Sequence, residues 1–263
     1  MNAYREKPLT ASGETKEAHE QDPNFLAAKR KFEADIRPGI DAYFPKLAAF
    51  TEEILRIIER SGKTAVFIGR DGRWLFYIAK LFAKEQGGGP GDKIKFIDIS
   101  TKYVTRRGDS SDDAPYSLGQ LENEYNAYFK KLSINISRSF LVDVGFQGTI
   151  ASDIRKVTDT TDNDDTLLVK SDLHLNPLTK GFYQGKTGPH GWDANVKMGH
   201  FVEKLPQVVL SVDELPRVRG GRLPKYEGKH DDLEVFLAQM TYQYLKKSVA
   251  EFEKNEKIRN ASA

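Results

Sequence analysis

The sequence predicts an α/β fold with a mainly parallel sheet flanked by helices, and with further helices at both ends of the chain. Two observations carry this prediction. Between residues 63 and 212, short runs of β-branched and aromatic residues alternate with longer amphipathic segments, which is the order of a parallel sheet joined by crossover helices. The chain has no cysteine, and 39% of its 263 residues are hydrophobic, so a core without disulfides is expected.

Residues 1–23 carry many charges and few large apolar side chains, so a disordered N-terminal segment is expected there. A single α/β domain is expected over residues 24–263. Its first part, residues 24–62, repeats apolar side chains at the spacing of one helical face and closes at Gly62, which predicts N-terminal helices. The residues at this spacing are Phe44, Leu47, Phe50, Ile54, Ile57 and Ile58.

The α/β core is expected over residues 63–212, before a C-terminal amphipathic helix over 231–255 that begins with two aspartates. The predicted strands of the core are 64–69, 93–100, 138–144, 166–173 and 206–212. Its predicted helices are 74–85, 118–131 and 149–157.

The strand that ends at Asp143 runs directly into a glycine-rich stretch, DVGFQGT. In an open parallel sheet, ligands bind beyond the carboxyl ends of the strands and next to helix N-termini. Backbone amides at Gly145, Gln147 and Gly148, with the Thr149 hydroxyl, would cradle a phosphate. Asp143 would accept hydrogen bonds from ribose hydroxyls or from a magnesium-bound water. The alternative is a structural strand-to-helix turn that Asp143 caps.

A second charged, glycine-containing stretch, IGRDGRW, follows the first predicted strand. Arg70 and Arg73 would bind an anion, and Asp71-Gly72 predicts a tight turn between them. Lys102, beyond the next predicted strand, would add positive charge. The alternative is an ordinary Asp-Gly turn with solvated arginines. Two such stretches at one sheet edge favour the anion-binding interpretation.

The strand, acid and Thr-Gly loop of DVGFQGT resemble the phosphoribosyl pyrophosphate loop of type I phosphoribosyltransferases. The chain has one acid where that family has two, and its loop is about one residue shorter. The resemblance implies a Rossmann-like or phosphoribosyltransferase-like sheet and a transferase. Asp143 would orient the ribose, the 145–149 amides would hold the 5′-phosphate, and Arg70 with Arg73 would hold the pyrophosphate. Mg²⁺ is the cofactor that this resemblance suggests.

GRDGRWLFYIAKLF, followed later in the chain by FLVDVGFQGTI, also resembles a bacterial domain that carries SRDG and DIGW-x-G-(S/T) motifs. That domain often lies downstream of a haloacid-dehalogenase-like domain in proteins linked to surface-polysaccharide gene clusters. HFVEKLPQ (200–207) is similar to a segment of the same domain. The resemblance spans residues 64–210 and implies a site without assigning a reaction. The implied site residues are Arg70, Asp71, Gly72, Asp143, Gly145, Gly148 and Thr149.

Two other classes of function stay open. FIDIST (96–101) has the pattern of the haloacid-dehalogenase nucleophile motif, with Asp98 as nucleophile, but Ser100 stands where the second acid is expected. A phosphohydrolase that uses Asp98 is therefore one alternative. The other is a non-catalytic module that binds a nucleotide or a partner protein and uses its long helices as an interface.

The charge balance and hydropathy limit the partners. Lys and Arg number 40 against 38 Asp and Glu, so no global field recruits nucleic acid or a membrane surface. No stretch approaches the roughly 20 apolar residues of a membrane span, and the polar N-terminus lacks a signal-peptide core. A cytoplasmic protein with a phosphorylated small-molecule ligand is expected, with the terminal helices as a surface for oligomer contacts.

Two further features leave their roles open. The five histidines are scattered, without a close pair that would hold a metal. The basic stretch RVRGGRLPK (217–225), within the connection 213–230, reads either as a mobile lid over an anionic ligand or as a solvated connection.

Overall fold

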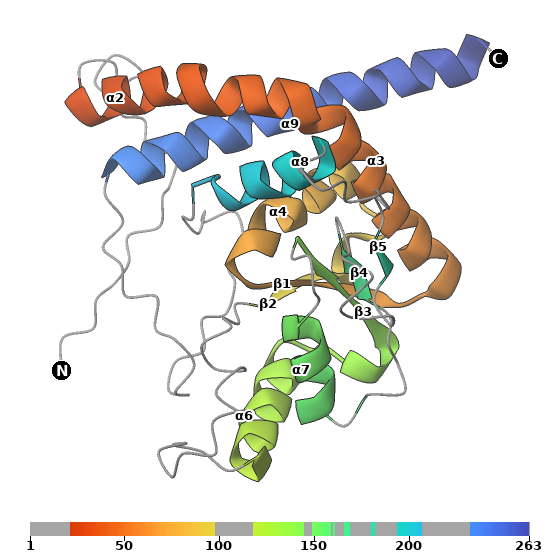
Figure 1. Ribbon diagram of the computed structural model, residues 1–263. Helices are drawn as coiled ribbons and strands as arrows, with labels where there is room; N and C mark the ends of the chain where they lie inside the picture. Colours follow the sequence, from red (N-terminus) through yellow and green to blue (C-terminus); the bar gives the residue numbers. More distant parts are fainter. Residues whose placement is uncertain are drawn as a thin grey trace, which may run out of the picture.

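The computed structural model describes residues 22–97, 118–144, 149–158, 160, 166–168, 180–181, 194–206 and 232–262. Its centre is a five-stranded sheet with the strand order β2-β1-β3-β4-β5 (Figure 1), in which each neighbouring pair is parallel. The predicted α/β class with a mainly parallel sheet is confirmed. The strands are β1 (Thr64–Ile68), β2 (Ile94–Ile97), β3 (Ser139–Asp143), β4 (Thr166–Leu168) and β5 (Lys180–Gly181).

The first four strands lie where the sequence predicts them, whereas the short β5 was not predicted. Residues 98–100 and 169–173, the ends of two predicted strands, lie outside the described residues. The same is true of residues 1–21 and of the predicted strand 206–212 beyond its first residue.

Helices make up most of the remaining described structure. They are α2 (Pro23–Lys31), the π-helix η1 (Phe32–Ile36), α3 (Arg37–Ser61), α4 (Gly69–Glu85), the 3₁₀-helices η2 (Gly91–Lys93) and η4 (Ile136–Arg138), α6 (Leu118–Lys131), α7 (Thr149–Val157), α8 (Ala194–Glu203) and α9 (Asp232–Ser262). The predicted bounds of α6 and α7 are confirmed. The C-terminal helix runs to Ser262, because 256–262 contains no glycine or proline that would end it.

Local signals set the ends of the N-terminal helices. The Asp22 carboxylate accepts a hydrogen bond from the Asn24 backbone N–H at 2.8 Å, and Pro23 occupies the first helical position. At the other end, Gly62 takes a left-handed φ of 67° and donates its N–H to the Ile58 carbonyl at 2.9 Å. Asp22 therefore caps α2 and Pro23 begins it, although the sequence assigned both residues to a disordered segment.

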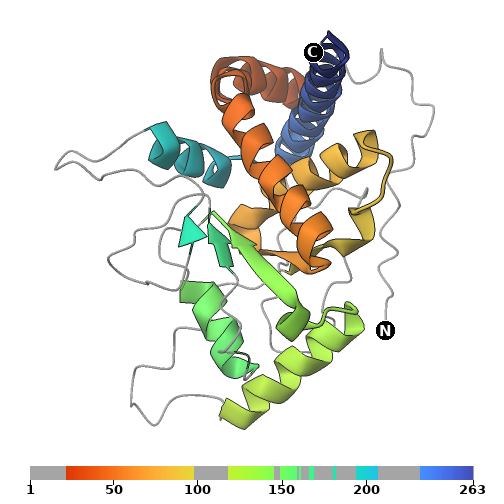
Figure 2. The same cartoon turned by 90° about the vertical axis from the view of Figure 1, so that its right-hand side faces the viewer.

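The sheet is covered by helices on both faces (Figures 1 and 2). Ala65 and Phe67 of β1 belong to the apolar core beneath α3, α4, α8 and α9. Val66 and Ile68 belong to the second core, with α6 and α7. Because successive side chains of a strand point to opposite faces, a strand covered on both sides must be apolar at every position. This requirement explains the unbroken apolar run of β1.

The strand order contains a reversal of direction. From β1 the chain crosses through α4 to β2 on one side, and it then returns past β1, with α6 before β3 on the other side. Helices α4 and α6 lie on opposite faces of the sheet (Figure 2), as right-handed crossovers require when the direction reverses. The switch point therefore lies between β1 and β3, which is where ligands bind in open sheets of this kind.

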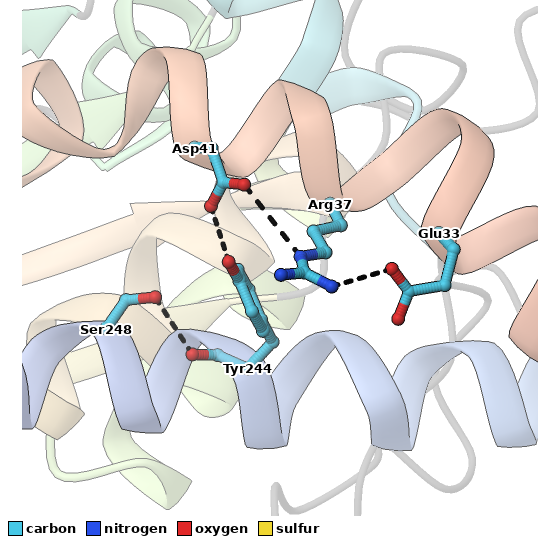
Figure 3. Close-up of polar contacts among 5 residues, drawn as sticks. All are labelled: Glu33, Arg37, Asp41, Tyr244 and Ser248. Atoms are coloured by element: carbon cyan, nitrogen blue, oxygen red, sulfur yellow. Dashed lines mark hydrogen bonds and ion pairs between the residues drawn. The ribbon is translucent and has the colours of Figure 1, made fainter.

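Polar contacts join the N-terminal helices to α9 (Figure 3). The Tyr244 hydroxyl donates to the Asp41 carboxylate at 2.5 Å, and Arg37 donates to Glu33 at 2.8 Å. The Arg37 guanidinium lies 5.4 Å from the centroid of the Tyr244 ring. The hydrogen bond to Asp41, and secondly burial, raise the pKa of Tyr244.

Carboxylates gather where α3 approaches the second half of α9. Glu253 is buried and accepts a hydrogen bond from the Gln86 side-chain amide at 2.9 Å. Burial, and secondly the charge of Glu256, raise the pKa of Glu52, while Arg56 opposes the rise.

None of the described helices combines the length and apolar character that crossing a membrane requires.

Candidate functional site

The candidate site lies at the carboxyl edge of the sheet, where β1 passes into α4 and β3 passes toward α7. Ile68 ends β1 in an extended conformation, with φ −109° and ψ 133°. Gly69 follows with φ 66°, a left-handed conformation that favours glycine, and α4 begins there. A single residue therefore turns the chain from strand to helix.

The sequence predicted a separate turn at RDGR and a helix from residue 74, and this prediction is wrong. Arg70, Asp71 and Gly72 lie in the first turn of α4, because the left-handed Gly69 already supplies the change of direction. The side chains of Arg70 and Asp71 are outside the description, so their roles in anion binding stay predictions.

Gly72 brings α4 against the end of β3. A Cβ atom built on Gly72 would lie 3.8 Å from the Val142 carbonyl oxygen and 3.6 Å from the Phe67 carbonyl carbon. Val142 directly precedes Asp143 in β3. The first turn of α4 and the acidic end of β3 are therefore neighbours, so the structure brings together two stretches that lie some 70 residues apart in the sequence.

Asp143 is the last residue of β3 and only 7% exposed. Its Oδ1 accepts a hydrogen bond from the Val144 backbone N–H at 2.7 Å. A hydrogen bond to a buried carboxylate is charge-assisted, and it fixes the orientation of the side chain. Asp143 is thus a held hydrogen-bond acceptor at the centre of the sheet edge.

The glycine-rich stretch after Asp143 is described only at its end. Helix α7 begins at Thr149, as predicted, although the Thr149 side chain is not described. Gly145, Gln147 and Gly148 lie outside the described residues, as does Lys102. Their roles in holding a phosphate stay predictions.

Arg73 does not have the exposed position that either sequence interpretation gave it. Its side chain is 1% exposed, and its guanidinium carbon lies 5.5 Å from the centroid of the Phe96 ring in β2. Consecutive residues of a helix point about 100° apart, so Gly72 faces Phe67 of β1 and the Val142 carbonyl of β3, while Arg73 faces β2. Arg73 is therefore a buried cation on the far side of β1 from Asp143.

Trp74, which follows Arg73, was not among the site residues predicted from the sequence. Its side chain is fully buried, and its Nε1–H donates to the Pro206 carbonyl oxygen at 2.8 Å. Pro206 ends the described segment that contains α8. No pattern in the sequence indicated this contact, because the two residues lie 132 positions apart.

Other candidate sites receive no support from the described residues. Within these residues, no group of three or more His, Asp or Glu side chains could hold a metal ion, so magnesium stays a prediction tied to a bound phosphate. Asp98, Ser100 and His174 lie outside the description. His200 is described, and its Nδ1 lies 3.0 Å from the Glu203 carboxylate in α8.

No protein-family model, curated protein or solved structure matches the chain. The function is therefore inferred from the arrangement of the residues themselves.

Proposed function

We propose that the carboxyl edge between β1 and β3 binds a phosphorylated sugar or nucleotide. The closeness of Gly72 to the Val142 carbonyl oxygen, which would lie 3.8 Å from a Cβ at Gly72, carries this proposal, because it places the first turn of α4 beside the strand that ends at Asp143. The two charged, glycine-containing stretches, IGRDGRW and DVGFQGT, thus follow β1 and β3, which are neighbouring strands at the switch point of the sheet.

Two helix N-termini supply the attraction for an anion. Helix α4 starts directly after β1, and α7 starts six residues after β3 ends at Asp143. The first amides of a helix have no partner within the helix, and the helix dipole places partial positive charge there. A phosphate at this edge would accept hydrogen bonds from these amides. Asp143, as a held acceptor, suits the hydroxyl groups of the attached sugar.

The most concrete form of the proposal is a phosphoribosyltransferase-like reaction on a Rossmann-like, doubly wound sheet. Asp143 would orient the ribose, the 145–149 amides would hold the 5′-phosphate, and Arg70 at the start of α4 would hold the pyrophosphate. An incoming nucleophile would form a bond to the anomeric carbon while the bond to pyrophosphate breaks. The protein would contribute positioning and stabilisation of the departing charge.

A haloacid-dehalogenase-like phosphohydrolase is less well supported. Its nucleophile, Asp98, directly follows β2, which pairs with β1 and lies one strand away from the switch point. A binding module without turnover would use the same edge as the transferase, so it differs from the main proposal only in chemistry.

A thermal-shift screen tests the proposal. The ligands are phosphoribosyl pyrophosphate, nucleotides, sugar phosphates and nucleotide sugars, each with and without Mg²⁺. A ligand present at about 100 times its dissociation constant adds about 2.7 kcal/mol to the unfolding free energy. This corresponds to a rise in Tm of about 5–11 °C.

The variants Asp143→Asn and Arg70→Ala should lose the shift, and Asp98→Asn should keep it. A shift with phosphoribosyl pyrophosphate that depends on Mg²⁺ and disappears in Asp143→Asn would support the transferase. If no phosphorylated compound shifts the wild type, or if both variants at the edge keep the full shift, the proposal is wrong. Loss of the shift in Asp98→Asn alone would favour the phosphohydrolase.

A further inference from the structure

The hydrogen bond between Trp74 and Pro206 joins two segments that lie 132 residues apart in the chain. Trp74 is fully buried, and Pro206 is buried as well. The indole ring has one N–H to donate, and proline has only its carbonyl to offer from the backbone. Because a buried carbonyl without a partner is costly, this bond selects one position of the α8 segment relative to α4.

The bond acts on the first part of α4 from the side opposite to the sheet contact. Gly72 lies against the end of β3, whereas Trp74, two residues later, contacts the end of the α8 segment. The Trp74 ring also packs edge-on against Tyr77 at 5.3 Å, and Tyr77 packs in the same way against Tyr242 of α9 at 5.8 Å. The start of α4 is therefore held between β3 on one side and the α8 and α9 layer on the other (Figure 1).

We infer that Trp74 is a positioning residue for the phosphate site, through its hydrogen bond to Pro206. This inference rests on the proposed function, since it concerns the helix N-terminus that would face the ligand. Amide donors bind a phosphate oxygen only within a narrow range of about 2.7–3.2 Å. Without the Trp74 donor, the hydrogen bond to Pro206 would no longer hold the start of α4 in place. A small displacement of the first turn of α4 would then break the bonds between its amides and the phosphate.

The experiment compares the affinity of three proteins for phosphoribosyl pyrophosphate with Mg²⁺ by isothermal titration calorimetry. They are the wild type, Trp74→Phe and the control Phe82→Leu. Phe82 is fully buried in the later part of α4 and stacks on Phe44 at 6.4 Å, so its variant also weakens the core but leaves the first turn intact. Trp74→Phe should bind at least about tenfold more weakly, because the loss of one amide hydrogen bond to a charged phosphate weakens binding by about that factor. Phe82→Leu should bind as the wild type does.

A second variant removes the donor without changing the shape of the side chain. In a Trp192→Phe background, Trp74 is the single remaining tryptophan, so it can be replaced by 3-benzothienylalanine, in which sulfur stands in place of Nε1–H. The same loss of affinity is expected in this protein, which keeps the packing of the ring. If Trp74→Phe does not fold, the 3-benzothienylalanine protein tests the positioning role of Trp74 in its place.

The outcomes separate the two proposals. If the wild type fails to bind the probe, the site itself is refuted, and the role of Trp74 with it. If the wild type binds and the 3-benzothienylalanine protein binds with the same affinity, the proposed site stands and the positioning role is wrong. Equal losses of affinity in Phe82→Leu and Trp74→Phe would also refute that role, because general loosening of the core would then explain both.

Discussion

Two glycines at the start of α4 should respond in opposite directions when each is replaced by alanine. Gly69 has a left-handed φ of 66°, whereas Gly72 has no such φ and lies within the first turn of the helix. The sequence gives both the same appearance, as the two glycines of IGRDGRW. Of these two residues, only Gly69 has a backbone conformation that favours glycine.

The magnitudes follow from the backbone and from the space around each residue. Alanine in a left-handed conformation costs about 1–2 kcal/mol, so Gly69→Ala should lower the unfolding free energy by that amount. At Gly72 a Cβ would meet neighbouring atoms at 3.6 Å, 3.7 Å and 3.8 Å, which are ordinary contact distances. Alanine is better than glycine within a helix by about 1 kcal/mol, so Gly72→Ala should raise the unfolding free energy. The two variants should differ by about 2–3 kcal/mol.

Urea unfolding followed by circular dichroism measures this difference directly, and a thermal scan should separate the two midpoints by at least about 4 °C. Equal stabilities, or a less stable Gly72→Ala, would refute the reasoning. The second result would mean that α4 lies closer to β3 than the contact distances state.

The remaining predictions concern the helical layer. Gly39→Ala should lower the unfolding free energy by about 1 kcal/mol, because its Cβ would lie 2.2 Å from the Phe201 ring and overpacking of about 1–3 kcal/mol exceeds the helical gain. Gly89→Ala, with no atom within 4 Å of the new Cβ, is the control and should change stability by less than about 0.5 kcal/mol in the same urea titration. Burial and the charge of Glu256 raise the pKa of Glu52 above its ordinary value of 4.5. The folded protein therefore holds this proton to higher pH than the unfolded chain does, and the unfolding free energy of the wild type falls as the pH rises above 4.5. Glu52→Gln should therefore be more stable than the wild type near neutral pH, by less than about 1 kcal/mol. Below about pH 4 the two proteins should be equally stable. Parallel profiles of unfolding free energy against pH would contradict this prediction.

Hydrophobic period and turn residues were enough to predict the class of fold. The apolar runs of β1 and β3 identify strands that are covered on both faces, and Gly62 identifies the end of α3. The strand order was not predictable, because it depends on which strands pair across long connections. That order, with β1 between β2 and β3, is what brings Asp143 beside the start of α4.

The candidate site was predictable in part, for a related reason. Asp143 was selected because a carboxylate at the end of an apolar strand is unusual, and its burial fits a special role. Arg73 was expected to bind a ligand from a loop, whereas it lies inside the fold against Phe96. The sequence alone could not distinguish a loop position of Arg73 from a buried helical one. The left-handed Gly69 replaces the expected turn, so α4 begins there and Arg73 lies within the helix.

The buried position of Arg73 gives an argument about charge that does not depend on the reaction. Arg73 is the fifth residue of α4, so its cation lies just after the first turn, near the positive end of the helix dipole, where cations are unfavourable and anions favourable. Burial removes the guanidinium from water, and the Phe96 ring lies 5.5 Å from the guanidinium carbon. The first amides of α4 lie at the carboxyl end of β1, next to the strand end that carries Asp143, and the Arg73 charge lies on the β2 side of β1. A bound anion would be stabilised by positive charge at this position, which supports the proposal of a phosphorylated ligand whether the site performs a transfer or only binds.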